Sequence, residues 1–442
     1  MAEHRRGANL PSIGGFNRTV VLDAVRRSPD GLSRVELASR TGLSAQTVSN
    51  VTRFLIEAGM IVESGTVVAG RGKPRTILRL EPGSRYAVGV HVDPAVVTYV
   101  LLDLAGTVVA SSTTSTPTAD DPSEVVRTIG SAVDGLIADA GVDVDGVLGV
   151  GIASPGPIDV DAGIVVDPPF LPRWRDVPLR DALAEATGYP VLLEKDVTAA
   201  AVGEMFLAGE SSARNFAFVY FGTGFGVGLV VDHEPVRGVG SNAGDAGHIM
   251  VDQGALAGTP DGSGTRGEVG AAVAPDRLVR IARERGVTFT GGSGGSDDSG
   301  GSDDSGGSDG SGGSGGSGGS DDSLDAVNRA WDELAAAIDA GDDAAVSLAA
   351  DAGTVMGDAA VVIVNLLDID RVVFGGPFWS RISSAALPAA RAAIVGSPLL
   401  VPKHAVDVVE SDRGADVAAV GAACLVLDAA LSPRASGLLI RR

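Results

Sequence analysis

The stretch AVGVHVDPAVVTYVLLDLAGTVVA, residues 87–110, decides the fold of the larger part of this chain. Two apolar runs flank the turn residues Asp93–Val96, so the stretch predicts a β-hairpin. A hairpin at the start of a large α/β domain is often where the phosphates of a nucleotide are held. That task requires glycines and a hydroxyl group in the turn, because backbone amides must approach the phosphates closely. Since this turn reads Asp-Pro-Ala-Val, we ask whether a phosphate loop has been dismantled.

The chain after residue 86 alternates between two kinds of segment. Apolar stretches ending in Gly, Pro or Asp predict strands, and Ala-rich stretches between them predict helices. The predicted strands lie in VLGVGIASPGPIDV, YPVLLEKD, FAFVYFGTGFGVGLVVD and IDRVVFGGP, and the predicted helices at 122–140, 178–188, 196–209 and 324–367. We therefore predict an α/β body of two lobes over residues 86–430.

One segment of the body has a different composition. Residues 291–323 contain only Gly, Ser and Asp, so they cannot bury apolar surface, and we predict a disordered, solvated insert. We interpret it as a tolerated surface loop, with a regulatory tether as the alternative. Residues 1–14 and 431–442 are predicted to be tails.

Residues 15–81 predict a small separate domain. Helical periodicity covers 17–28, 32–42 and 43–59, and the second helix opens with Ser33 and Glu36 at the spacing of a capping box. Two strands around the turn GRGKPR follow over residues 60–80. Three helices and a basic hairpin are the parts of a winged helix-turn-helix.

The third predicted helix suits DNA recognition. If Val48, Val51, Leu55 and Ile56 pack inward, the opposite face presents small and hydrogen-bonding side chains that suit base edges and phosphates. The hairpin turn adds basic residues that suit phosphates or a minor groove. An ordinary three-helix bundle with an exposed basic turn is the alternative. The candidate DNA contacts are Ser44, Gln46, Thr47, Ser49, Asn50 and Arg53 on the helix, and Arg71, Lys73 and Arg75 in the hairpin.

The charge of the chain is distributed unevenly between its N-terminal part and its body, which indicates that the two parts differ in function. The chain has 442 residues, 44% of them hydrophobic, and a net charge of −22. Residues 1–80 hold 12 Lys and Arg against 6 Asp and Glu, so only this part suits a polyanion. The single cysteine, Cys424, excludes an internal disulfide and a thiolate zinc cluster. With no signal peptide and no apolar run of about 18 residues, we expect a cytoplasmic protein without a membrane span.

Four stretches of the body resemble the ROK family of repressors and sugar kinases. They are GVGIASPGPID (149–159), PPFLPRWRDVPL (168–179), LEKDVTAAAVGEMF (193–206) and FVYFGTGFGVGLVVDHEPVRGVGSNAGDAGHIMVD (218–252). The resemblance implies a two-lobed actin/hexokinase-like (ribonuclease H-like) fold. It extends over nearly the whole chain, because many ROK repressors carry a winged helix-turn-helix in front.

The resemblance answers the question about the first hairpin. In the kinases of this family the turn has the form Asp-x-Gly-Gly-Thr. The Asp falls here on His91, the two glycines on Asp93 and Pro94, and the Thr on Ala95. A carboxylate repels phosphate and proline lacks an amide donor, so the phosphate loop is dismantled and ATP binding is not expected. Two Gly-rich turns survive as vestigial nucleotide-binding positions, unless they are kept only for folding. Their residues are Gly222, Thr223, Gly224, Gly375 and Gly376.

The sugar pocket that the resemblance implies is also altered. The Asn-Asp pair that holds the catalytic base reads Lys195–Asp196, and a second sugar-binding Asn falls on Phe170. The Glu of the Glu-x-Gly-His motif is Asp245, His248 is kept, and a further sugar-binding Glu falls on Gly270. Lys195 suggests an anionic effector such as a sugar phosphate or sugar acid, unless it only pairs with Asp196 or Asp245. The candidate effector contacts are Gly156, Lys195, Asp196, Asp245 and His248.

The zinc cluster of the family is not expected here. Its three cysteines fall on Asp261, Ser263 and Glu268, and one histidine with two carboxylates and a serine is a poor structural zinc site. We expect no metal, and His248 is either a ligand contact or a satisfied core histidine.

These features together predict a transcriptional repressor of ROK type that binds a double-stranded DNA operator. The body would bind a small sugar or sugar derivative between its lobes, and the family and symmetric operators imply a homo-oligomer, dimer or tetramer. An active ATP-dependent sugar kinase with a DNA-binding head is one alternative. A regulator without an effector, in which the body only oligomerises, is the other.

Overall fold

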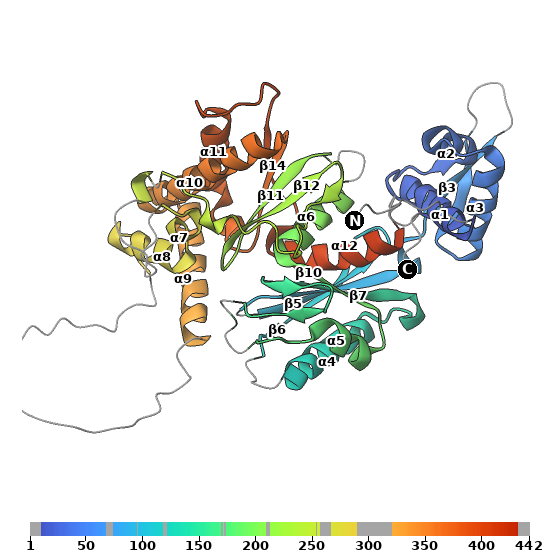
Figure 1. The fold of residues 1–442 in the computed structure, drawn as a ribbon, viewed down its shortest axis with the longest axis horizontal. Helices are drawn as coiled ribbons and strands as arrows, with labels where there is room; N and C mark the ends of the chain where they lie inside the picture. The colour runs from blue at the N-terminus through green and yellow to red at the C-terminus, as the bar shows by residue number, and fades with distance from the viewer. Residues whose placement is uncertain are drawn as a thin grey trace, which may run out of the picture.

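The computed structural model describes residues 10–67, 74–94, 96–117, 122–168, 171, 174–208, 213–252, 254–256, 267–289 and 321–431. Figure 1 shows a small head at the N-terminal end and a larger body of two lobes, as the sequence predicts. The predicted α/β class of the body is confirmed, because each lobe contains a five-stranded sheet covered by helices.

The head is a three-helix unit with a small antiparallel sheet in the order β1-β3-β2. The capping box at the start of α2 is confirmed, and the hydroxyl of Ser44 accepts from Thr47 N at the start of α3. The first helix, however, begins at Leu10, inside the segment predicted as the tail 1–14. The elements are α1 (Leu10–Arg26), β1 (Leu32–Ser33), α2 (Arg34–Thr41), α3 (Ala45–Glu57), β2 (Ile61–Val67) and β3 (Arg75–Leu80).

The first lobe is built on a sheet with the strand order β10-β7-β4-β5-β6. The predicted hairpin 87–110 is confirmed as β4 and β5, and its last residues start a third strand, β6. Helices α4 and α5 cover one face of this sheet. The elements are β4 (Tyr86–Val92), β5 (Val96–Asp103), β6 (Val108–Ser115), α4 (Pro122–Ala140), β7 (Val147–Ser154), β8 (Ile158–Asp159), β9 (Ile164–Val165), α5 (Leu179–Thr187) and β10 (Val191–Lys195).

The second lobe contains a sheet with the strand order β13-β12-β11-β14-β15. The stretch 324–367 forms two helices, and the first of them begins at Asp321, so residues 321–323 of the predicted insert are helical. The rest of that insert lies outside the described residues. The elements are β11 (Phe216–Phe221), β12 (Phe225–Val231), β13 (Glu234–Pro235), α7 (Val269–Ala272), α8 (Pro275–Glu284), α9 (Asp321–Asp339), α10 (Asp343–Leu367), β14 (Arg371–Gly375), α11 (Trp379–Val395) and β15 (Asp407–Glu410).

Two helices, α6 (Asp196–Leu207) and α12 (Val417–Leu431), lie between the two sheets (Figure 1). Helix α12 packs on β4 and β7 of the first sheet, while α6 packs on α12 and on β11 and β12 of the second. Glycines allow this close packing, since a Cβ on Gly151 would lie 1.8 Å from the carbonyl oxygen of Ala422. The helix pair therefore connects the lobes through backbone-to-backbone packing.

The head packs against the body through one continuous apolar cluster. Leu22 and Val25 of α1 belong to the same cluster as Phe206 of α6 and Leu427 of α12. The guanidinium group of Arg26 lies 3.8 Å from the centroid of the Phe206 ring and donates from Nη1 to the Phe206 carbonyl oxygen at 2.8 Å. The end of α6 is thus in direct contact with the head.

Within the described part of the chain, two helices are long and apolar enough to cross a membrane by length and composition. They are α10 and the segment Gly414–Leu431, which includes α12, and most of each is buried inside the body. Their apolar character is accounted for by packing in the core.

Candidate functional site

A pocket of about 640 Å³ lies between the lobes, a size that fits a small-molecule ligand. The turn after β4, the segment after β7 and the end of β10 supply its wall from the first lobe. These strand ends meet at one edge of the sheet, where α/β proteins bind ligands. The turn between β11 and β12 and the residues around η4 (Ala246–His248) supply the opposite wall. All five predicted effector contacts line this pocket, namely Gly156, Lys195, Asp196, Asp245 and His248.

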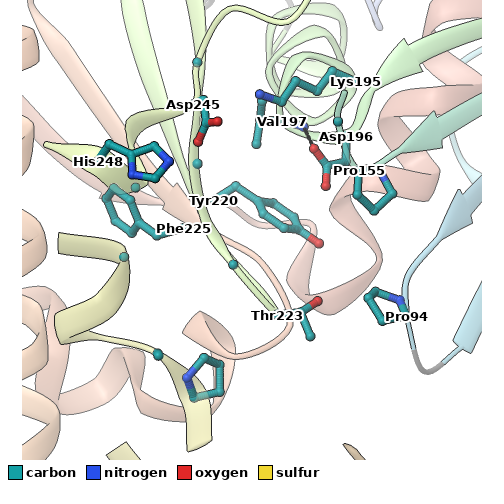
Figure 2. Close-up of a pocket in the computed structure, with 18 of the residues that line it drawn as sticks. Pro94, Pro155, Lys195, Asp196, Val197, Tyr220, Thr223, Phe225, Asp245 and His248 are labelled. Atoms are coloured by element: carbon teal, nitrogen blue, oxygen red, sulfur yellow. Dashed lines mark hydrogen bonds between the residues drawn. The ribbon is translucent and has the colours of Figure 1, made fainter. Parts of the chain in front are cut away.

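Asp196 lies in the pocket as the first residue of α6 (Figure 2). Its Oδ1 accepts a hydrogen bond from Val197 N at 2.7 Å. Burial raises the pKa of the Asp196 carboxyl, an effect that His91, the Val197 amide and Lys195 partly offset. Asp196 thus presents a partly desolvated carboxyl group that can accept a hydrogen bond from a ligand hydroxyl.

Lys195 precedes Asp196, and its side chain is buried. Its ammonium group donates to the carbonyl oxygen of Asn242 at 3.3 Å. The interpretation that Lys195 pairs with Asp196 or Asp245 is wrong, because no carboxylate of the described residues lies within ion-pairing distance of it. The ammonium group is therefore held beside the pocket by a backbone carbonyl.

Hydrogen bonds connect the two walls next to Lys195. Asn242 donates from Nδ2 to Ile158 O at 2.7 Å and accepts from Ile158 N at 2.8 Å. Arg237 donates from Nε to the buried Glu194 at 2.6 Å. Because Asn242 and Arg237 follow β13, these bonds fix the position of the second lobe against β8 and β10 of the first.

Asp245 and His248 are exposed toward the pocket from the second lobe (Figure 2). The His248 side chain is 73% exposed, so the alternative of a core histidine is wrong. His248 Nδ1 lies 3.2 Å from Oε1 of Glu268, the residue at the third cysteine position of the family's zinc cluster. Asp261 and Ser263 lie outside the described residues. A histidine hydrogen-bonded to a glutamate, with an aspartate and a serine, does not fit a structural zinc site.

The turn between β4 and β5 is hydrogen-bonded to the turn between β11 and β12. Thr223, between β11 and β12, donates from Oγ1 to Oδ2 of Asp93, between β4 and β5, at 2.8 Å. The carboxylate of Asp93 and the ring of Pro94 thus face the pocket where the resemblance places nucleotide phosphates. Ala95 lies outside the described residues.

Two of the remaining predicted nucleotide positions, Gly222 and Gly376, also have a role in the fold. Gly222 N donates to Gly224 O at 3.0 Å within the β11–β12 turn. Gly376 has a φ of 112°, and a Cβ there would lie 2.5 Å from Phe221 O, so the fold itself requires glycine. Thr223 and Gly224 line the pocket, whereas Gly222, Gly375 and Gly376 do not.

Three polar residues of the pocket, Tyr220, Asn242 and Asp276, were not predicted from the sequence. Asn242 was not singled out from its loop, although it bridges the lobes as described above. Tyr220 was treated as part of an apolar strand, although its hydroxyl faces the pocket (Figure 2). The available signal was a tyrosine next to the end of a buried strand, two residues before the Gly-Thr-Gly turn.

The second candidate site is the outer face of α3. Ser44, Gln46, Asn50 and Arg53 are exposed, and Val48, Val51 and Leu55 are buried as predicted. Gln46 donates from Nε2 to Asn50 Oδ1 at 3.2 Å, one helical turn away. Thr47 and Ser49 are half-buried beside this face.

The basic hairpin is only partly described. Arg75 is exposed at the start of β3, and Arg71 and Lys73 lie outside the described residues. Sequence reasoning also missed Phe54, which is 42% exposed on α3 with the guanidinium group of Arg18 located 4.1 Å from its ring centroid.

Comparisons with known families match both parts of the chain. The model of the ROK family matches residues 87–429, and a model described as winged helix-turn-helix DNA-binding matches residues 21–62. The described fold and the predicted domain order agree with these matches.

Curated relatives include repressors. The xylose repressor of Bacillus subtilis is 28% identical over 246 residues, 55% of this chain and 63% of that protein. The DNA-binding transcriptional repressor Mlc of Escherichia coli is 26% identical over 222 residues, 50% of this chain and 54% of that protein. An uncharacterized protein of Sinorhizobium fredii is 32% identical over 214 residues, 48% of this chain and 54% of that protein. The matched region thus spans between about half and two thirds of these relatives.

Solved structures share the fold. A ROK family transcriptional regulator, a homologue of Escherichia coli Mlc, has a TM-score of 0.69 at 22% identity and covers 97% of this chain and 98% of its own. A ROK family glucokinase from Streptomyces griseus, solved with glucose and AMPPNP, has a TM-score of 0.57 at 23% identity. It covers 77% of this chain and 98% of its own. At these identities the likeness establishes the architecture alone.

Proposed function

This chain belongs to the ROK family and carries a winged helix-turn-helix ahead of the family's domain, and from this premise we propose that it is a transcriptional repressor controlled by a small carbohydrate. The observation that carries the proposal is the shared core of head and body. Leu22 of the head and Phe206 of α6 belong to one apolar cluster, and α6 begins at the pocket with Asp196. A ligand that moves α6 therefore acts on the head.

The DNA contacts belong to the head. Its third helix presents Gln46, Asn50 and Arg53 outward, and such side chains suit base edges and phosphates of a major groove. Homo-oligomerisation as a dimer or tetramer would place two heads on paired half-sites. Likeness to the xylose repressor and Mlc supports this assignment.

The effector is a sugar or sugar derivative bound in the pocket. Lys195 is one ammonium group among five acidic side chains of the lining, those of Asp93, Asp196, Asp245, Glu268 and Asp276. This balance of charge favours an uncharged sugar over the anionic effector that Lys195 alone suggests, because an anion would be repelled by the carboxylates. Carboxyl groups also accept hydrogen bonds from sugar hydroxyls.

An active sugar kinase is the second candidate. Asp196 favours it, because it occupies the position of the kinase base. The hydrogen bond between Asp93 and Thr223 opposes it, since both turns that would hold phosphates are engaged with each other. We propose that phosphotransfer has been lost.

Two assays of the purified full chain test the proposal. Mapping of bound genomic DNA, followed by gel shifts on the duplexes recovered, is expected to show salt-sensitive and sequence-specific binding. A coupled assay of ADP release over a panel of hexoses and pentoses is expected to stay at the level of a blank without enzyme. Saturable ADP release would support the kinase, and the absence of salt-sensitive binding to any duplex would overturn the repressor.

A further inference from the structure

Tyr220 stands out among the residues that line the pocket. It is the fifth residue of β11, and its neighbours along the strand alternate between the two faces of the sheet. Phe216, Phe218 and Tyr220 pack in the cluster that contains α6, whereas Ala217 and Val219 pack in the cluster on the other face. The ring of Tyr220 is therefore held by the core on the α6 side, and its tip reaches the pocket (Figure 2).

The hydroxyl group of Tyr220 has no hydrogen-bond partner among the described residues, although Tyr220 is only 5% exposed. A buried hydroxyl without a partner costs free energy, and such groups in folded proteins call for an explanation. Since this hydroxyl faces a pocket rather than a packed core, a bound molecule can supply the partner.

The neighbours of Tyr220 make its hydroxyl a hydrogen-bond donor. Burial, with the negative charges of Asp196 and Asp93, raises the pKa of Tyr220 well above its usual value, so the phenol stays protonated at neutral pH. His91 packs against the ring edge-on, with the ring centroids 6.3 Å apart. A Cβ on Gly222 would lie 2.8 Å from the ring, so Gly222 leaves the space that Tyr220 occupies.

Tyr220 and Asp196 form a complementary pair. Figure 2 shows the phenol hydroxyl and the carboxylate directed into the same pocket, and no hydrogen bond joins them. A sugar hydroxyl donates one hydrogen bond and accepts others, so it satisfies a carboxylate acceptor and a phenol donor at once. An ammonium group has no acceptor for the phenol, and an alkyl group has neither donor nor acceptor, so neither satisfies both.

We propose that Tyr220 is a specificity-determining residue of the effector site, donating its phenol hydrogen bond to a sugar hydroxyl that in turn donates to Asp196. This inference rests on the proposed function and deepens it, because it names a contact outside the positions that the family resemblance implies. It assigns the ligand to the class of uncharged polyhydroxylated compounds with a free hydroxyl at the Asp196 end of the pocket.

The substitution Tyr220→Phe tests the proposal, because it removes one hydroxyl group and preserves the ring. Tyr99→Phe is the matched control. Tyr99 is a buried tyrosine of β5, outside the residues that line the pocket, and its hydroxyl lies 3.2 Å from Oγ1 of Thr114. Both variants and the wild type are titrated with D-xylose and D-glucose by calorimetry, and their unfolding in urea is measured without sugar.

For Tyr220→Phe we expect affinity for the bound sugar to fall about tenfold or more, with stability in the absence of sugar equal to or above that of the wild type. For Tyr99→Phe we expect unchanged affinity and a lower urea midpoint, because it loses a bond within the protein. Equal sugar affinity of Tyr220→Phe and wild type would overturn the inference and leave the proposed function standing. If neither sugar, nor any other of a pentose and hexose panel, binds the wild type, the sugar-controlled function itself fails, and the inference fails with it.

Discussion

At the scale of single residues, the buried carboxyl group of Asp196, which lines the pocket, lowers the stability of the folded protein at neutral pH. Its raised pKa means that the folded protein holds the carboxyl proton more tightly than the unfolded chain does. The unfolded chain loses that proton first, near pH 4. The contribution of Asp196 to stability therefore decreases as pH rises from about 4 through the raised pKa, and it stays low above that value.

We accordingly predict that Asp196→Asn is more stable than the wild type at pH 7, and that this difference shrinks toward pH 4. The same change should weaken sugar binding about 10- to 100-fold, because a charge-assisted hydrogen bond is lost. Urea unfolding at a series of pH values, together with sugar titration at pH 7, measures both effects. A variant that is less stable at pH 7 but binds sugar normally would show that Asp196 is a structural residue.

Cys424 permits a second test at this scale. It is buried in α12, and burial raises the pKa of its thiol to about 12. At pH 8 the thiolate is a very small fraction, so we predict no alkylation by iodoacetamide in the native protein within an hour and complete alkylation in 8 M urea. Mass spectrometry of the intact chain reads out the label. Rapid labelling without urea would mean that α12 is not packed between the sheets as described.

Some residues of the pocket could be predicted from the sequence, and others could not. Lys195, Asp196, Asp245 and His248 were found because they occupy positions of a known pattern. Tyr220 could not be found in this way, since the pattern does not tell whether a buried hydroxyl has a partner. The alternative that Lys195 pairs with Asp196 or Asp245 was wrong, because pairing depends on side-chain distances that spacing along the chain does not fix.

At the scale of elements, local signals located most boundaries. The capping box of α2 was predicted because it depends on two side chains three residues apart. The start of α1 was missed because Pro11, Gly14 and Gly15 are poor helix formers, although proline is tolerated in a first turn. The break between α9 and α10 was missed in an Ala-rich run, where Gly341 at a φ of 77° and the N-cap Asp342 separate the helices.

Helix α3 gives a prediction about DNA recognition. We expect Asn50→Ala to cost about 1–3 kcal/mol on the specific duplex and to relax preference at one base position. We expect Arg53→Ala to weaken binding to all duplexes and to reduce the slope of log affinity against log salt by about 1. Fluorescence anisotropy over a range of salt concentrations measures both.

The control for this pair is Arg214→Ala, which removes an exposed arginine of the body that pairs with Asp232. It should leave the affinity and the salt slope unchanged. Equal effects of the α3 variants and this control would place the DNA surface elsewhere on the molecule.

At the scale of the whole molecule, the docking of head on body was beyond sequence reasoning. Leu22 and Val25 have the periodicity of a helix that packs in its own domain, and nothing in the spacing shows that they also meet Phe206. The domain order was predictable from the motifs, whereas the shared core depends on which apolar faces come together in space.

The contact of Arg26 with Phe206 yields a prediction about coupling. The Arg26 side chain is buried, bonded to the Phe206 carbonyl and paired with Asp23 at 2.7 Å. We predict that Arg26→Ala still binds sugar and still binds DNA when each is measured alone. Sugar typically changes DNA affinity by a factor of about 5–150 where two sites are allosterically coupled, and we expect a much smaller change in this variant. Arg34→Ala, which breaks an ion pair within the head, is the control and should retain the coupling.

Control of the DNA-binding head by a sugar in the cleft is the central proposal for this protein. Its most direct test is the DNA affinity of the purified full chain, measured by fluorescence anisotropy on a genomic duplex that it binds, without and with a saturating sugar. We predict that the sugar changes the affinity of the wild type at least fivefold and that of Asp196→Asn hardly at all at the same concentration. The contradicting result would be a wild type that binds the sugar by calorimetry but has the same DNA affinity with and without it.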